Sequence, residues 1–266
     1  MKKIIFWAFV ALMMVGCCKG SDKSSDTKSL RILSYNVGVF NKYIKDGYAD
    51  VANIIKETNA AIVLFQELDS CTTRTGKVYQ LERICSMLDG EWDFKFGAGL
   101  LSYREGQYGV GIASKQKAVE KFSKNLANYN DSERRGLAVL DMGDYVVAST
   151  HLGLKDEAQI KQLEEITTLL KGRYGNSGKP VFLGGDLNAA PDFALMPELK
   201  KDWTILTTTS TATYSTEADK YCIDYVLLLN NGAQVEVTSS AVVREAASAD
   251  VRKASDHYPI YVDVKF

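Results

Sequence analysis

The sequence predicts a single α/β domain made of β-sheets with helices on their outer faces. In the first half of the chain, strand-like and helix-like hydrophobic patterns alternate, which is typical of layered α/β folds. The second half contains mainly strand-like segments that follow one another in pairs. These segments recur to the end of the 266 residues without a linker. A chain of this length can bury a full core in one domain. We therefore predict one domain over residues 30–266.

The first half begins with a strand at residues 30–37, where the side chains alternate in polarity. Residues 60–66 form a short, uninterrupted apolar run, as expected for a strand that is covered on both faces. The spacing of apolar side chains predicts helices at 49–57 and 77–89. Further strand patterns occur at 92–97, 108–114, 136–141 and 144–150.

The second half contains the clearest helix pattern and then mostly strands. Residues 157–171 carry four isoleucine and leucine side chains on one helical stripe. The remaining strand patterns occur at 181–186, 222–229, 234–243 and 258–265. The chain therefore ends in a β-rich region.

The composition excludes several classes of protein. Hydrophobic residues make up 46% of the chain and charged residues 24%, which rules out a disordered, collagen-like or coiled-coil chain. The formal net charge is −1, so no global basic field attracts nucleic acid.

The N-terminal residues 1–16 have the pattern of a signal peptide. Two lysines precede an apolar run at 4–15, which is too short to span a bilayer comfortably. A small residue then precedes Cys17, as in the lipobox of bacterial lipoproteins. We expect Cys17 to be the lipidated N-terminus. Ordinary signal cleavage beside an incidental cysteine is the alternative.

Residues 17–29 are predicted to be a lipidated cysteine followed by a polar tether. After the cysteines, the stretch consists of Ser, Asp, Lys, Thr and Gly, which cannot bury enough apolar surface to fold. We expect an exported protein that is held on the bacterial outer membrane by this anchor alone, on the periplasmic or the surface side. The other four cysteines match no metal motif, and we expect mostly free, packed thiols, although export permits disulfides. They are Cys18, Cys71, Cys85 and Cys222.

Acidic, amide and imidazole side chains occur where the predicted strands begin or end. Each of them alone could cap a turn, sit in solvent or be a satisfied core residue. Together they include both histidines of the chain. A hard divalent cation binds carboxylate and amide oxygens, and phosphate hydrolysis needs a cation, a base and hydrogen-bond donors. The set consists of Asn36, Glu67, His151, Asp186, Asn188, Asp224, Asp256 and His257.

The order of the motifs around these residues resembles that of the endonuclease/exonuclease/phosphatase superfamily. This superfamily includes pancreatic deoxyribonuclease, abasic-site endonucleases, neutral sphingomyelinases and inositol polyphosphate 5-phosphatases. Each motif is short, but the ordered set spans residues 30–266. The motifs are Tyr-Asn36-Val, Gln-Glu67-Leu-Asp, Tyr-Gly-Val-Gly-Ile-Ala-Ser at 108–114, Thr-His151-Leu, Gly-Gly-Asp186-Leu-Asn188, Ile-Asp224-Tyr and Ser-Asp256-His257-Tyr-Pro-Ile.

The resemblance implies a deoxyribonuclease-like, four-layer α/β sandwich and a metal-dependent hydrolase of phosphate esters. By the same resemblance, Glu67 is the principal Mg²⁺ ligand, with Asn36 beside it, and Asp256 is a carboxylate on or behind the metal. Mn²⁺ and Ca²⁺ also suit such oxygen ligands. Gly38 departs from the abasic-site branch, which has an aspartate near the metal at this position, so we expect fewer ligands from this strand.

The resemblance also implies a mechanism of direct, in-line attack by water on phosphorus. In that mechanism Asp186 orients or deprotonates the water, and Asn188 donates a hydrogen bond to the scissile phosphate. No covalent intermediate forms. The metal ion neutralises charge on the phosphate and on the leaving oxygen.

The two histidines are expected to donate to the phosphate oxygens. By resemblance, His257 faces the phosphate and is paired with Asp224, whose carboxylate would fix the tautomer and raise the pKa of the imidazole. His151 matches the second histidine of the deoxyribonuclease-like and phosphatase branches, where the abasic-site branch has a tyrosine. The residue that orients His151 is open, and Glu105 is a guess.

The substrate is less constrained than the chemistry. Arg74, Lys77 and Arg104 could contact substrate phosphates or could be solvated surface charges. One hypothesis is an exported nuclease or phosphodiesterase, with nucleic acid as a partner. A second is a phosphatase or phosphodiesterase for inositol phosphates or sphingomyelin-like substrates. A non-catalytic binding module is disfavoured, because every matched position holds a competent residue. We expect a monomer.

Overall fold

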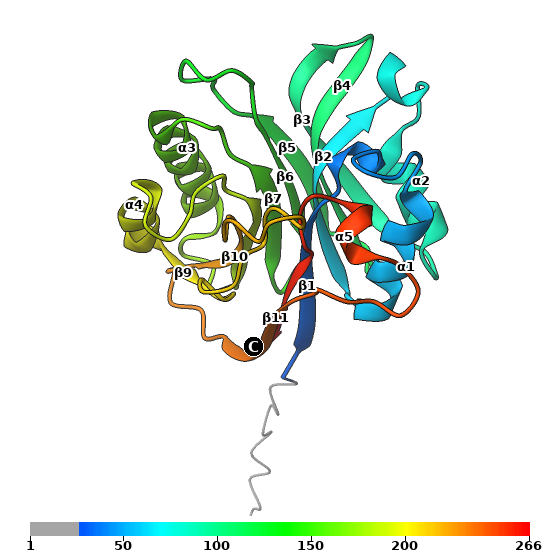
Figure 1. Ribbon diagram of the computed structural model, residues 1–266. Coiled ribbons are helices and arrows are strands. Elements are labelled where there is room, and N and C mark those ends of the chain that lie inside the picture. Colours follow the sequence, from blue (N-terminus) through cyan, green and yellow to red (C-terminus); the bar gives the residue numbers. More distant parts are fainter. Residues whose placement is uncertain (1–26) are drawn as a thin grey trace, which may run out of the picture.

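The computed structural model describes residues 27–266, which form two six-stranded β-sheets packed face to face (Figure 1). The predicted two-sheet sandwich is therefore confirmed. The first sheet has the order β11 (Glu236–Val242), β12 (Ile260–Lys265), β1 (Ser29–Asn36), β2 (Ile62–Ser70), β4 (Gly106–Ser114) and β3 (Asp93–Tyr103). The second has the order β5 (Glu120–Asn125), β6 (Gly136–Asp141), β7 (Val146–His151), β8 (Val181–Asp186), β10 (Asp224–Leu229) and β9 (Trp203–Ile205).

Helices cover the outer faces of both sheets, as predicted (Figure 1). The first sheet is covered by α1 (Tyr48–Thr58), α2 (Gln80–Met87) and α5 (Val251–Ala254). The second is covered by α3 (Asp156–Tyr174) and α4 (Leu195–Asp202). A third apolar cluster lies between the two sheets and includes Ile62, Val147 and Phe182, all fully buried. Each such side chain contributes about 1.5–3 kcal/mol through burial, so this inner layer fixes the sheets against one another.

One parallel strand pair in each sheet positions the polar residues. Strands β1 and β2 run parallel and are joined through α1, and β7 and β8 run parallel and are joined through α3. The carboxyl ends of parallel strands lie at the same edge of a sheet, where functional groups gather. In the observed register Asn36 lies opposite Gln66, and His151 lies opposite Asp186. Both parallel pairs therefore end in polar side chains.

The predicted elements are present, and four further elements appear. Strands β5 and β9 and helices α4 and α5 had no clear pattern in the sequence. Strand β5 is an edge strand that alternates partly buried and exposed residues with no fully buried one, and its lysines mask the strand pattern. Strands β2 and β3 extend four and six residues beyond their predicted ends at 66 and 97, because polar residues continue the hydrogen-bonded ladder past the apolar run.

The domain begins slightly earlier than predicted. Strand β1 starts at Ser29, and the backbones of Lys28 and Phe266 exchange hydrogen bonds of 2.8 and 3.1 Å. The predicted signal peptide 1–16 and Cys17 lie outside the described residues. Within residues 27–266, no helix is long and apolar enough to cross a membrane.

The described cysteines are free thiols. Cys85 and Cys222 are buried, as expected for packed thiols, and burial raises the pKa of Cys85 to about 12. Cys71 is exposed, so the expectation of packing is wrong for that residue.

Candidate active site

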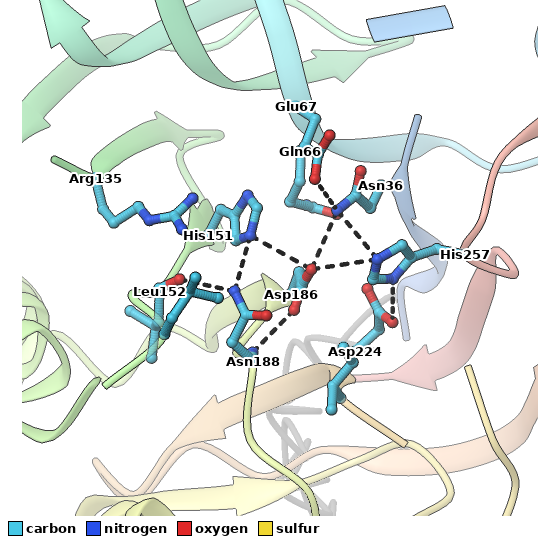
Figure 2. A network of polar contacts seen from close by, with 12 residues as sticks. Asn36, Gln66, Glu67, Arg135, His151, Leu152, Asp186, Asn188, Asp224 and His257 are labelled. Carbon is cyan, nitrogen blue, oxygen red and sulfur yellow. Dashed lines mark hydrogen bonds and ion pairs between the residues drawn. The ribbon is translucent and has the colours of Figure 1, made fainter. Parts of the chain in front are cut away.

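All eight predicted metal and catalytic residues gather at one edge of the sandwich. Figure 2 labels seven of them, all except Asp256. The eight residues come from the ends of β1 and β7, from within β2, from the end of β8 and the turn after it, from the start of β10 and from the turn before β12. Six of the eight line a cleft of about 530 Å³. The other two, Asn36 and Asp224, are buried beneath it and contact lining residues. Residues from both sheets thus form one site.

Asn36 and Glu67 meet because β2 contains a bulge. The register of β2 against β4 shifts between Phe65 and Leu68, and Glu67 has a φ of 57°. Such a bulge redirects a side chain that regular alternation would aim elsewhere. The Asn36 Nδ2 donates to Glu67 Oε1 at 3.2 Å and to Asp186 Oδ2 at 3.1 Å. One buried amide therefore connects the two sheets at the site.

The close approach of β8 to β7 requires glycine just before Asp186. Gly185 has a φ of 147°, and a Cβ atom there would lie 1.9 Å from the carbonyl oxygen of Thr150. Glycine is the residue that tolerates both the conformation and the contact. The Gly-Gly-Asp motif thus brings the Asp186 carboxylate beside His151, with Nε2–Oδ2 at 3.4 Å.

Asp224 and His257 form a buried carboxylate–imidazole pair. His257 Nδ1 lies 2.9 Å from Asp224 Oδ2, and the Thr213 hydroxyl donates to the same oxygen at 2.6 Å. Burial by itself would lower the pKa of His257, but the charges of Asp224 and Asp186 raise it to about 10. His257 is therefore a cation at neutral pH. Its Nε2 lies 3.5 Å from Asp186 Oδ2.

Asp186 is a buried carboxylate with a pKa near neutrality. Burial raises its pKa to about 7, and the charge of His257 and the Asn188 backbone N–H oppose that shift. That N–H donates to Asp186 Oδ1 at 2.8 Å. A carboxylate of this kind can accept a proton from water near pH 7.

His151 is a neutral imidazole whose orientation is set by Asn188. Burial and the positive charges of Arg135 and His257 hold the pKa of His151 well below its ordinary value. The Asn188 Nδ2 lies 2.9 Å from His151 Nε2 and donates to the Leu152 carbonyl at 3.0 Å (Figure 2). Asn188 thus occupies the orienting position that the sequence left open.

Glu105 is not that orienting residue. It lies in the turn between β3 and β4 and forms an exposed ion pair with Lys77 at 2.5 Å. The pattern of the sequence could not show this, because it does not give the direction of a side chain in a turn.

The donor set fits a hard divalent cation. Glu67 and Asp256 present carboxylate oxygens to the cleft, and Asn36 lies beside Glu67. Asp256 is buried, and its Oδ1 makes no hydrogen bond within the described part of the chain. A buried, unpartnered carboxylate oxygen is costly unless a cation or water completes it. All of these ligands are oxygens, which suits Mg²⁺, Mn²⁺ or Ca²⁺.

A second group of possible ligand atoms has a different explanation. Atoms of Asp186, Asp224 and His257 lie within 4.8 Å of one another. However, both carboxylates hold the imidazole as a cation, and an imidazolium has no lone pair for a metal ion. This cluster is therefore better suited to proton handling and phosphate binding.

The two predicted substrate-binding arginines do not line the cleft. Arg74 makes two hydrogen bonds of 2.7 and 2.8 Å to the buried carboxylate of Asp69. Its guanidinium also stacks on Tyr103, and Arg104 packs against the same ring near the β3–β4 turn. The structure thus assigns Arg74 to a local ion pair, and the prediction of phosphate contacts gains no support.

Other side chains that line the cleft had no signal in the sequence. Arg135 is buried next to His151 (Figure 2), and it pairs with Glu133 at 2.9 Å. Lys42 also lines the cleft and is the second basic side chain there besides the histidines. The rim is apolar and aromatic, through Leu154, Phe193, Tyr214 and Tyr221. Arg135 follows a polar turn and could equally have been structural. Only the tertiary contact with His151 identifies it.

Replacement of Asn188 by alanine tests its role at this site. We expect turnover to fall about 10²-fold with a smaller change in KM, because His151 loses the contact that orients it. Steady-state kinetics would measure both parameters. Asn231→Ala, outside the cleft, is a control for loss of a partly buried amide. Unchanged turnover in Asn188→Ala would remove Asn188 from the mechanism.

Comparison with family models gives one match. Residues 33–257 match the model of the Endonuclease/Exonuclease/phosphatase family. This range contains all eight site residues at their motif positions, and it ends at the last of them, His257. A search of the curated proteins finds no match.

Solved structures with the same fold are similar over nearly the whole chain. An endonuclease/exonuclease/phosphatase family protein from Bacteroides thetaiotaomicron has a TM-score of 0.71 at 18% identity, over 90% of this chain and 96% of that one. A mannosyl-6-phosphatase from the same species has a TM-score of 0.71 at 16% identity, over 89% and 100%. The human Nocturnin catalytic domain with bound sulfate has a TM-score of 0.66 at 14% identity, over 90% and 96%. These likenesses support the fold.

Proposed function

Because the chain belongs to the Endonuclease/Exonuclease/phosphatase family, a family of phosphate-ester hydrolases, we propose that it hydrolyses phosphate esters with a bound divalent cation, Mg²⁺, by direct attack of water on phosphorus. The observation that carries this proposal is the juxtaposition of the Asp224–His257 pair with Asp186 and with the oxygen ligands Asn36 and Glu67. A site of this kind combines a base, a cationic donor and a metal position in one cleft.

The residues that would hold the metal ion are Glu67, Asn36 and Asp256. When bound, a divalent cation supplies charge neutralisation to the phosphate and to the leaving oxygen. The protein contributes the base and the hydrogen-bond donors, and neighbouring side chains already orient these groups.

Asp186 holds the attacking water and accepts its proton. Its Oδ1 is fixed by the Asn188 backbone N–H, and its Oδ2 is fixed by Asn36. The cationic His257 donates to a non-bridging oxygen of the phosphate, and Asp224 keeps it in place from behind. His151, neutral and held by Asn188, is the second donor to the phosphate. These donors stabilise the charge that grows on the oxygens in the transition state.

We propose a phosphodiester, in the manner of an endonuclease, as the first substrate class. A second class, small phosphate esters such as sugar, inositol or lipid-derived phosphates, is favoured by the charges at the cleft. Among residues 27–266, Lys42 and Arg135 are the basic residues that line it apart from the two histidines, and each is paired with an acid. A nuclease that binds several phosphates of its substrate would be expected to have more unpaired basic side chains in the cleft.

We further propose that the protein is an exported monomer that Cys17 anchors to the outer membrane through lipid. The support is the sequence pattern of residues 1–16 and the polar stretch before β1. Labelling with a radioactive fatty acid in cells, with Cys17→Ser as control, tests the anchor. Label retained in the variant would contradict it.

The experiment that tests the function is a hydrolysis panel with purified protein. Plasmid DNA, a bis-aryl phosphodiester, inositol and sugar phosphates and sphingomyelin are each incubated with Mg²⁺ or with EDTA, beside His257→Ala. We expect hydrolysis that EDTA abolishes and that His257→Ala lowers at least about 10²-fold. DNA nicking would support the phosphodiester class, and activity on a small phosphate alone would support the second. Activity that persists in EDTA would contradict metal dependence.

A further inference from the structure

Lys42 lies on the carboxylate that the metal site would use. It follows the short 3₁₀ helix Gly38–Phe40, and its Nζ lies 2.5 Å from Asp256 Oδ2. The side chain of Lys42 is 42% exposed and lines the cleft, whereas that of Asp256 is 7% exposed. One carboxylate oxygen of Asp256 is therefore paired with an ammonium, and the other is buried with no partner among residues 27–266.

Lys42 pairs with one acid of the cleft and shares the cleft with another. Lysine carries a positive charge at neutral pH, and the Lys42 ammonium forms an ion pair with Asp256. Glu67 lines the same cleft as Lys42.

Gly38 makes room for this lysine. A Cβ atom on residue 38 would lie 3.2 Å from the Cβ of Lys42 and 3.7 Å from Asp256 Oδ1, and Gly38 has a φ of 50°. A side chain at this position would crowd Lys42 and would itself reach the Asp256 carboxylate. The lack of a side chain at position 38 therefore leaves the space in which Lys42 lies beside Asp256.

We propose that the Lys42 ammonium is a tethered cation that competes with the divalent metal ion for the carboxylate of Asp256, and that it thereby sets a low metal affinity at this site. This inference rests on the proposed metal dependence of the hydrolase. Its physical basis is like-charge repulsion. A unit charge a few ångströms from a divalent ion opposes binding even at the intermediate dielectric of a protein surface. The ion pair with Asp256 must also break for the metal to use that oxygen.

Metal binding measured without substrate tests the proposal. Mn²⁺ is titrated into the wild type and into Lys42→Met by isothermal calorimetry and by electron paramagnetic resonance of the free ion. We expect Lys42→Met to bind Mn²⁺ about tenfold tighter or more. Lys42→Arg keeps the charge and should bind as weakly as the wild type. Lys45 belongs to the same loop as Lys42 but lines a different pocket. Lys45→Met should therefore leave the affinity unchanged.

A melting-temperature measurement gives a second readout. Lys42→Met leaves both oxygens of the buried Asp256 without a cation, so the metal-free variant should melt at a lower temperature and gain more from Mn²⁺ than the wild type. Equal affinities in the wild type and in Lys42→Met would overturn the role of Lys42 and leave the proposed hydrolase standing. If neither protein binds Mn²⁺, the metal site is wrong and both proposals fall.

Discussion

Glu67→Gln is expected to lower metal-dependent turnover at least about 10²–10³-fold while leaving the fold intact. Glutamine keeps the shape of the side chain and can still accept the hydrogen bond that Asn36 donates at 3.2 Å. It removes the charge that would hold the divalent cation. The backbone bulge that aims this side chain does not depend on the charge.

The measurement is steady-state hydrolysis over a range of Mg²⁺ concentrations, together with a thermal melt. Glu105→Gln is the matched control, because Glu105 is exposed in the β3–β4 turn and pairs only with Lys77 among the described residues. If high Mg²⁺ partly restores Glu67→Gln, the defect is in metal affinity. Turnover equal to that of the wild type would sink the metal assignment.

Asp224→Asn is expected to lower turnover about 10²–10³-fold at pH 8 and to change the dependence of the rate on pH. Asparagine can still accept from Thr213 and His257, so the geometry is retained. What is lost is the negative charge that raises the pKa of His257 to about 10 against the opposing effect of burial.

The sign of the pH effect follows from that shift. A raised pKa means that His257 stays protonated as the pH rises through neutrality, so the wild type should keep its cationic donor until about pH 10. In Asp224→Asn the imidazole loses its proton at a lower pH, so the alkaline fall in rate should move from about pH 10 toward neutral pH. A pH–rate profile from pH 5 to about 10 measures this. Asp219→Asn, at an exposed aspartate that pairs with Arg244, is the control. If the rate of Asp224→Asn depended on pH in the same way as the wild-type rate, His257 would not act as a cation.

Local patterns in the sequence were sufficient to identify the chemistry of the site. Glu67, His151 and Asp186 each follow or end an apolar strand pattern. The carboxyl ends of parallel strands meet at one edge, so residues in these places come together in any layered α/β fold. The order of the motifs indicated the family, and the resemblance to that family implied the role of each site residue.

Side-chain direction could not be obtained in the same way. Regular alternation does not predict the bulge that turns Glu67 into the cleft. Arg74 could have contacted substrate phosphates, but its Nε and Nη2 donate to the buried carboxylate of Asp69. Asp69 is only five residues away, at the end of β2, but the hydrophobic pattern does not show which way either side chain points.

The local patterns of the sequence determined sheets with outer helices and the strand-end positions of the acids and histidines, because burial leaves a local pattern. The resemblance carried by the ordered motifs added the two-sheet sandwich and the oxygen ligands expected for the metal ion. Only the tertiary structure decided that Asn188 orients His151, that Arg135 lies next to that imidazole and that Lys42 covers Asp256. Each of these contacts joins residues that are far apart in the chain or belong to a loop. Their energies depend on distance and burial in the folded protein, and no hydrophobic period encodes either quantity.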